Sequence, residues 1–254
     1  MRYSPFSLEN KVAIVTGATS GLGQAMSAAL AQAGADIAGV GSSDAFRETA
    51  EAVKAAGRRF LAIRADLAET EASAYIVTKT RAELGRIDIL VNNAGIIRRR
   101  PCIEFTEDDW DTVMDVNLKA AFFLAQAVAK AFIEQGSGGK IINVASMLSF
   151  QGGILVPSYT ASKSGLAGVT RTMANEWAAK GINVNAIAPG YMATRATEAI
   201  RKDPARNQAI LDRIPAGRWG EPSDLGGMVV FLASAASDYC HGGIYPVDGG
   251  WLAR

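Results

Sequence analysis

The stretch KVAIVTGATSGLG, residues 11–23, sets the class of fold. Its first half is a short apolar run bounded by polar residues, which is typical of a buried strand. Gly17, Gly21 and Gly23 follow, and residues 24–33 then place apolar side chains at helical spacing. Strand, glycine-rich turn and helix in this order let a pyrophosphate approach the backbone at a helix N-terminus. The alternative is a glycine turn without a ligand, and the loop lacks the Gly-Lys-Ser/Thr of a phosphate-binding NTPase loop.

The same alternation of strand and helix continues along the chain. Further strands are predicted at residues 35–40, 60–65, 87–91, 140–145, 182–188 and 244–247. Seven strand candidates alternating with six helical segments predict one α/β domain over residues 1–254. We expect a Rossmann-type, doubly wound parallel sheet with helices on both faces, which binds ligands outside the carboxyl ends of its strands. The polar, irregular stretch 191–218 follows a strand end and predicts a substrate-covering insertion.

Composition narrows the classes of function. The 26 Lys and Arg residues balance 25 Asp and Glu residues, so no overall charge recruits nucleic acid or a membrane surface. Two cysteines fit a reducing compartment, and the single His241 excludes a metal site of several histidines. A Ser-His-Asp triad would have to use His241 itself. No membrane span or signal-peptide segment is evident, so we expect a cytoplasmic protein with no metal site.

Tyr159 and Lys163 lie four residues apart, behind Pro157 at the start of a predicted helix, and therefore share one helix face. Two unit charges about 4 Å apart interact by roughly 4 kcal/mol at a dielectric near 20, equivalent to roughly 3 pKa units. We therefore expect Lys163 to lower the pKa of Tyr159 toward neutrality. Ser146 follows the strand at 140–145, where catalytic hydroxyls lie in such folds. The alternative is a surface helix carrying an unrelated tyrosine and lysine.

The end of the second strand bears on the choice of cofactor. An acid there binds the ribose 2′-hydroxyl of NAD, and a nearby arginine accommodates the 2′-phosphate of NADP. The sequence instead reads Gly41-Ser42-Ser43-Asp44, and either serine can bond a hydroxyl or a phosphate. Ser43 could also cap the helix predicted at 44–56. Because the acid at position 44 disfavours a phosphate, NAD(H) is favoured, without excluding NADP(H).

Two further strand ends carry polar or small residues. Asp66 could accept from an adenine amino group or cap the helix predicted at 69–84. Asn92-Asn-Ala-Gly95 offers small residues that allow a ligand to approach the backbone closely.

Two polar features lie further along. Arg98-Arg-Arg100 could capture a carboxylate or phosphate, or form a solvated loop. Asn117 falls inside a helix predicted from Thr106 to about residue 134, where asparagine is mildly unfavourable. Its amide could bond a backbone group or water, or simply be tolerated.

Together, TGATSGLG, NNAG, Asn117, Ser146, YTASK and PG, in this order, resemble the short-chain dehydrogenase/reductase family over essentially the whole chain. The resemblance implies hydride transfer with a nicotinamide cofactor. It implies Tyr159 as general acid/base, Lys163 on the nicotinamide ribose, Ser146 on the substrate oxygen and Asn117 anchoring a relay water. The cofactor positions that it implies are Gly17, Ser20, Gly21, Leu22, Gly23, Ser42, Asp66, Leu67, Asn93, Ala94, Gly95, Tyr159, Lys163, Pro189, Gly190, Met192 and Thr194. Gly41 departs from the acid that NAD-preferring members carry.

Longer stretches, among them AGIIRR, SMLSFQGG, IPAGRWGEPSDL and VDGGWLAR, resemble sugar-acid dehydrogenases of uronate breakdown within that family. This implies a carboxylate-bearing substrate and a homotetramer. Arginines suit a carboxylate, and the candidates are Arg98, Arg99 and Arg195, with Gln151 for substrate hydroxyls. The alternatives are a 3-oxoacyl-carrier-protein reductase and a catalytically inactive nucleotide-binding module.

Overall fold

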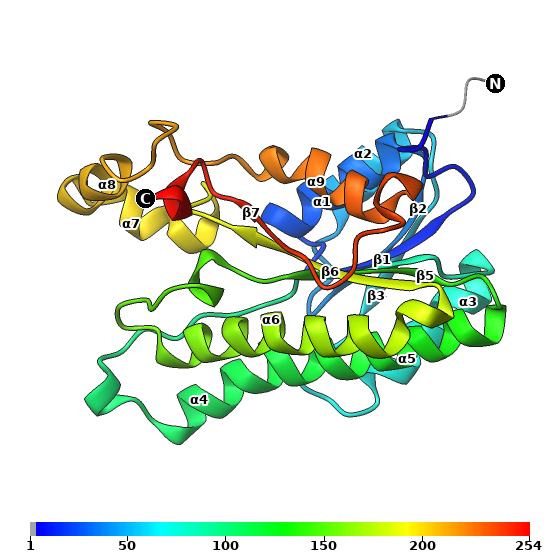
Figure 1. The fold of residues 1–254 in the computed structure, drawn as a ribbon, viewed down its shortest axis with the longest axis horizontal. Coiled ribbons are helices and arrows are strands. Elements are labelled where there is room, and N and C mark those ends of the chain that lie inside the picture. The colour runs from blue at the N-terminus through cyan, green and yellow to red at the C-terminus, as the bar shows by residue number, and fades with distance from the viewer. Residues whose placement is uncertain (1–3) are drawn as a thin grey trace.

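The computed structural model describes residues 4–254, so the first three residues, on which the expectation of no signal peptide partly rests, lie outside the described range. Within this range, seven parallel strands form one sheet in the order β3-β2-β1-β4-β5-β6-β7 (Figure 1). The strands are β1 (Val12–Thr16), β2 (Asp36–Gly41), β3 (Phe60–Arg64), β4 (Ile89–Asn92), β5 (Gly139–Val144), β6 (Ile182–Pro189) and β7 (Ile244–Val247). The predicted doubly wound parallel sheet is confirmed.

Helices cover both faces of the sheet (Figure 1). One layer contains α1 (Gly21–Gln32), α2 (Arg47–Ala55) and α9 (Gly226–Ala233), and the other contains α3 (Ala72–Leu84), α5 (Ala120–Gln135) and α6 (Pro157–Trp177). Strand side chains alternate between two cores: Val15 and Ile37 face the first layer, and Ile14 and Val40 face the second. Because both faces are covered, the strands read as continuous apolar runs.

The remaining helices lie toward one end of the molecule (Figure 1). α4 (Glu107–Met114) leads into α5, while α7 (Glu198–Lys202) and α8 (Pro204–Leu211) belong to the stretch after β6. Strand order places the topological switch point at β1, which pairs with β2 on one side and β4 on the other. The loops that follow β1 and β4 therefore lie at the same edge of the sheet, where ligands bind in sheets of this kind.

The helix predicted as continuous from Thr106 to about residue 134 contains a π-helical turn, Asp115–Lys119, between α4 and α5. Such turns are frequent at functional sites, and this one carries Asn117. Of the described residues, Glu107–Gln135 is the one helical segment long and apolar enough to cross a bilayer. Its apolar side chains pack in the second core, among them Leu124, Val128 and Phe132, so it is a core helix.

Two helix caps considered as alternatives to cofactor contacts do not form. α2 begins at Arg47 behind Phe46, with no side-chain cap, so Ser43 does not cap it. α3 begins at Ala72. Asp66 instead accepts a hydrogen bond from the Ala68 N–H at 3.0 Å, which is a local turn ahead of the helix.

Candidate active site

The glycine loop after β1 is a closely packed cradle. Gly17 and Gly21 adopt positive φ angles of 66° and 56°, a conformation that favours glycine. A Cβ on Gly17 would lie 2.7 Å from the Asn93 amide nitrogen, and one on Gly23 would overlap the Gly17 carbonyl. The loop therefore accepts no side chain at Gly17 or Gly23.

Thr16 and Asn93 clamp this loop to the end of β4. The Thr16 hydroxyl accepts hydrogen bonds from the Asn93 and Ala94 N–H groups, both at 2.9 Å. The Asn93 side-chain amide donates to the Thr16 carbonyl at 2.9 Å. Sequence reasoning missed Thr16, although a hydroxyl ending an apolar strand directly before a glycine loop is a usable signal.

The beginning of α1 fits a pyrophosphate. Its first turn contains no acidic side chain, and the N-cap residue Ser20 makes no side-chain hydrogen bond to the helix. Backbone N–H groups and the positive end of the helix dipole therefore face the loop without a competing anion. The Thr194 methyl lies 3.8 Å from the position of a Cβ on Gly21, so the stretch after β6 meets the cradle here.

Tyr159, Lys163 and Ser146 come together beside this edge of the sheet. Lys163 is buried, with 3% of the residue exposed. Its ammonium donates to the Val144 carbonyl at 2.6 Å and lies 5.7 Å from the centroid of the Tyr159 ring. The Tyr159 hydroxyl shares a hydrogen bond with Ser146, whose Oγ also accepts from the Leu148 N–H at 3.1 Å. Phenol, hydroxyl and ammonium thus lie together, and Tyr159 and Lys163 share one face of α6.

Asn117 completes the group from the π-helical turn. Its amide nitrogen donates to the Ile96 carbonyl at 3.0 Å, and its oxygen accepts from the Ile96 N–H at 2.8 Å. A Cβ on Gly95 would lie 3.2 Å from the Asn117 oxygen and 3.6 Å from the Lys163 ammonium. The backbone after β4 therefore passes between these two side chains, and Asn117 is bonded to backbone rather than merely tolerated.

The expected lowering of the Tyr159 pKa by Lys163 is wrong for this structure. Burial raises the pKa of Tyr159, opposed by the hydrogen bond from Ser146 and the charge of Arg99. Burial also lowers the pKa of Lys163 to about 8, and its ammonium is directed at a carbonyl. The Tyr159 phenol is therefore protonated at neutral pH, a state suited to donating a proton.

The three consecutive arginines point to different partners. Arg98 and Arg100 lie 3.7 and 3.5 Å from the Asp109 carboxylate. Arg99 donates to the Ala196 carbonyl at 3.3 Å, and its charge acts on Tyr159. Arg195 is exposed. Of the candidate arginines, Arg99 is thus the one that the structure associates with the catalytic group.

At the end of β2, the carboxylate of Asp44 is engaged by Arg64, at 3.1 Å across from the end of β3. A Cβ on Gly41 would lie 2.6 Å from the Thr19 methyl and 3.2 Å from the Phe46 ring. An acid at position 41 would collide with both, which accounts for the departure from the usual pattern. Ser42 is exposed beside this pair.

The other predicted site residues lie around the same edge. Asp66 and Leu67 follow β3, Pro189 ends β6, and a Cβ on Gly190 would lie 2.6 Å from the Asp248 Cα. Gln151 is half-buried after the turn that begins at Ser146. A small third core fixes the insertion next to Ser146; its buried members are Met147, Ile210, Ile214 and Trp251.

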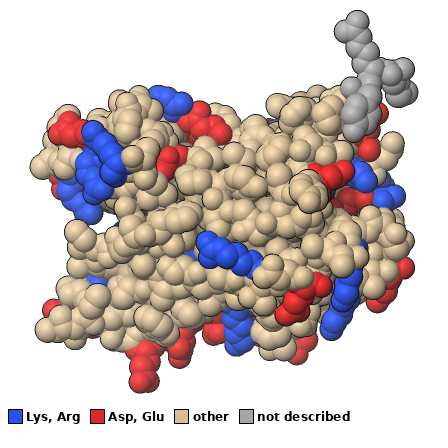
Figure 2. Space-filling view, viewed as in Figure 1, with Lys and Arg blue, Asp and Glu red and all other residues tan. Residues whose placement is uncertain are grey.

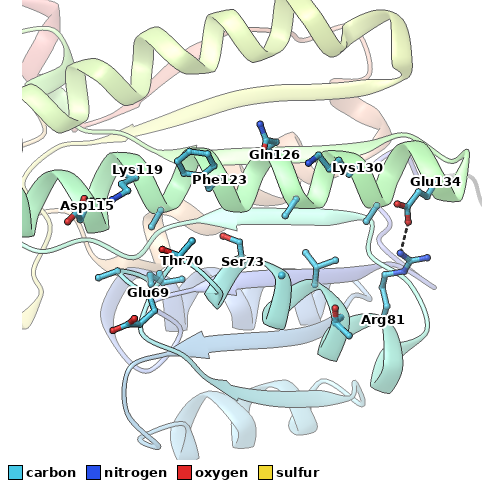
Figure 3. Close-up of a pocket in the computed structure, with 18 residues that line it drawn as sticks. Glu69, Thr70, Ser73, Arg81, Asp115, Lys119, Phe123, Gln126, Lys130 and Glu134 are labelled. Carbon is cyan, nitrogen blue, oxygen red and sulfur yellow. Dashed lines mark hydrogen bonds and ion pairs between the residues drawn. The ribbon is translucent and has the colours of Figure 1, made fainter.

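A groove of about 580 Å³ lies elsewhere, between α3 and α5. Figure 3 shows Phe123, Gln126 and Lys130 on α5 along one wall, with Ser73 and Arg81 on α3 opposite. Of the predicted site residues, the groove lining includes only Leu67. The groove is therefore separate from the catalytic group.

The fold, the glycine cradle and the Asn-Ser-Tyr-Lys group define a class, and comparison with known proteins agrees. The family model described as enoyl-(acyl carrier protein) reductase matches residues 17–252. The chain belongs to the short-chain dehydrogenase/reductase family, as a nicotinamide-dependent oxidoreductase acting on CH–OH groups.

Individual relatives narrow this further. The chain is 63% identical to 2-dehydro-3-deoxy-D-gluconate 5-dehydrogenase of Escherichia coli K12 over 254 residues, 100% of both chains. A solved chain from Agrobacterium tumefaciens with bound NADP, provisionally named 2-deoxy-D-gluconate 3-dehydrogenase, is 57% identical with a TM-score of 0.94, covering 99% of this chain and 100% of that one. A 3-oxoacyl-[acyl-carrier-protein] reductase of Thermotoga maritima is 39% identical over 96% of this chain and 98% of its own.

Proposed function

We propose that the protein transfers a hydride between a nicotinamide dinucleotide and the keto or hydroxyl carbon of a deoxy sugar acid, of the 2-dehydro-3-deoxy-D-gluconate type. The observation that carries this proposal is Arg99, a guanidinium whose charge reaches Tyr159 while it bonds the insertion. A guanidinium there suits a substrate carboxylate. The 63% identity to a dehydrogenase of that name over the full chain supports the same substrate class.

The residues present fit the cofactor. The glycine loop and the first turn of α1 would hold the pyrophosphate, Asp66, Leu67, Asn93 and Gly95 would line the adenosine half, and Pro189 to Thr194 the nicotinamide half. When bound, the dinucleotide supplies or accepts the hydride. Lys163 would hold its ribose, because its ammonium lies beside Tyr159 and behind Gly95.

Proton transfer falls to Tyr159. In the reducing direction its neutral phenol donates a proton to the substrate oxygen, which the Ser146 hydroxyl holds in place. In the oxidising direction the phenolate must accept that proton, so oxidation is expected to become faster as the pH rises. Asn117 fixes the backbone at Ile96 that lines this site, and we assign it the water of the proton relay.

The cofactor preference that we propose is a modest one for NAD(H). Arg64, at the end of β3, is engaged by Asp44, and the Asp44 carboxylate would repel a 2′-phosphate. Position 41 is a glycine and carries no acid that would exclude the 2′-phosphate of NADP. The Agrobacterium tumefaciens relative has NADP bound. We expect kcat/KM for NADH to exceed that for NADPH by about tenfold, worth about 1.4 kcal/mol.

Initial rates with sugar acids and acyl thioesters test the substrate class. We expect turnover of keto-deoxy sugar acids and little turnover of 3-oxoacyl thioesters. Faster turnover of the thioesters would favour the acyl-carrier-protein reductase alternative. Cofactor binding without turnover of either class would favour an inactive nucleotide-binding module.

We also propose a cytoplasmic homotetramer. Both cysteines are free, which suits a reducing compartment. On α5, Phe123 lines the groove of Figure 3, and Phe123 and Ile133 are each 48% exposed. Exposed apolar side chains of this kind mark subunit contacts. Light scattering coupled to gel filtration tests this: we expect a mass near four times 26.7 kDa, and a Phe123→Glu variant should dissociate.

A further inference from the structure

The turn Arg195–Thr197, with its N-cap residue Thr194, receives two guanidinium groups. Arg99 donates to the Ala196 carbonyl at 3.3 Å, from the loop after β4. Arg201 donates to the Thr194 carbonyl at 3.2 Å, from α7. Two cations from separate segments of the chain thus converge on carbonyls two residues apart.

This turn lies between the two halves of the active site. Its N-cap residue, Thr194, meets the glycine cradle at Gly21, with the methyl 3.8 Å from a Cβ placed there. At Ala196 it contacts Arg99, whose charge acts on Tyr159. A ligand that spans cradle and phenol therefore passes alongside the turn and the arginines that hold it.

Arg201 has donor capacity left over. Its Nε is inaccessible to solvent and has no hydrogen-bond partner within the described structure. The nearest acid on its helix, Glu198, is paired with Lys202 instead, at 2.6 Å. In residues 4–254, Arg201 and Arg99 have no carboxylate partner, whereas Arg98 and Arg100 share Asp109. The Arg201 side chain as a whole is partly buried, but a buried N–H donor without an acceptor is costly, and an anionic ligand would supply the missing acceptor.

We propose that Arg201 is a second anion-binding arginine of the active site, acting with Arg99 on an oxyanion of the bound ligand. The oxyanion is either the carboxylate of the sugar acid or the pyrophosphate of the dinucleotide. A guanidinium suits both, because its fork of N–H donors matches carboxylate and phosphate oxygens. The inference rests on the proposed function for the carboxylate source, and on the cradle alone for the pyrophosphate source.

Arg201→Gln tests this, because glutamine retains an N–H donor for the Thr194 carbonyl but carries no charge. Arg201→Lys keeps the charge, and Arg206→Gln, an exposed arginine on α8 of the same insertion, is the matched control. Dissociation constants are measured for NADH, for the probe D-gluconate and for its uncharged counterpart D-glucitol. Thermal melting establishes that each variant is folded.

We expect Arg201→Gln to raise the dissociation constant for D-gluconate or for NADH by about tenfold or more, which is the size of a lost charge-assisted hydrogen bond. Arg201→Lys should retain most of the affinity, and Arg206→Gln should match the wild type. Weaker binding of D-gluconate but not of D-glucitol would identify the substrate carboxylate as the oxyanion that Arg201 binds. Weaker binding of NADH would identify the pyrophosphate.

Unchanged affinity of Arg201→Gln for NADH and D-gluconate would overturn the proposal. So would equal weakening of D-gluconate and D-glucitol with NADH unaffected, because that result describes a residue that only shapes the turn. If the wild type neither binds D-gluconate nor turns over sugar acids, the proposed substrate is wrong. The NADH measurement then still decides the role of Arg201.

Discussion

Replacing Gly23 by alanine would test the cofactor cradle at its tightest point. A Cβ at this position would overlap the Gly17 carbonyl oxygen and lie 2.6 Å from the Asn93 amide nitrogen. Ordinary contact begins near 3.4 Å, so the Asn93 amide must move by about 0.8 Å and the Gly17 carbonyl by more, and that carbonyl is backbone that cannot rotate away. Overpacking of this kind costs about 1–3 kcal/mol, which for a chain of this size lowers Tm by roughly 2–10 °C.

The same displacement should weaken cofactor binding. Moving the loop takes its N–H donors away from the pyrophosphate, and each hydrogen bond to a charged group contributes about 1.5–3 kcal/mol. We therefore expect NADH to bind roughly 10- to 100-fold more weakly, measured by quenching of protein fluorescence, with Tm followed by circular dichroism.

Gly227→Ala is the matched control. Gly227 lies in α9, and a Cβ there would meet nothing within 4 Å. Alanine in a helix should raise the free energy of unfolding by up to about 1 kcal/mol and leave NADH binding unchanged. A Gly23→Ala protein that binds NADH as the wild type does would refute the cradle.

Three further predictions follow from the catalytic group. Lys163→Met should expose the linkage of stability to pH. The folded pKa of Lys163 is lowered to about 8, so the unfolded chain binds more protons above pH 8. The free energy of unfolding of the wild type relative to the mutant should rise by about 1 kcal/mol between pH 8 and 9 in urea titrations; a flat difference contradicts the burial argument. Arg99→Gln should raise KM for a sugar acid by about tenfold and Arg100→Gln, paired with Asp109, by far less; equal effects in steady-state assays would exclude Arg99 as carboxylate ligand. Asn117→Ala leaves two Ile96 backbone groups unpaired and should cost about 2–4 kcal/mol of stability, so an unchanged urea midpoint would argue against that contact.

The fold was predictable because its signals are local. Each strand is a short apolar run, and the glycine loop after β1 requires a backbone that only glycine supplies. Parallel strands bring their carboxyl ends to one edge, so Ser146 and Asn93 could be placed together from the sequence.

The electrostatics of the site could not be predicted in the same way. Spacing places Lys163 beside Tyr159, but the resulting pKa depends on burial and on the Val144 carbonyl, neither of which a helical repeat encodes. Arginine direction is likewise a tertiary property. Asp109, on α4, pairs with Arg98 and Arg100, whereas Arg99 bonds the Ala196 carbonyl of the insertion.

The role of Arg201 was also hidden from the sequence. It is one of five arginines in the polar stretch 191–218, and nothing in its spacing distinguishes it. Its bond to Thr194 and its buried Nε arise only when α7 folds against the turn after β6.

The central claim is that the Tyr159 phenol passes the proton while the dinucleotide passes the hydride. Single-turnover oxidation of NADH by the Tyr159→Phe protein, with a keto-deoxy sugar acid, measures this directly. We predict a rate reduced by about 10²–10⁴-fold, the usual contribution of a positioned general acid, with NADH affinity close to that of the wild type. A mutant that keeps about a tenth or more of the wild-type rate would contradict the account.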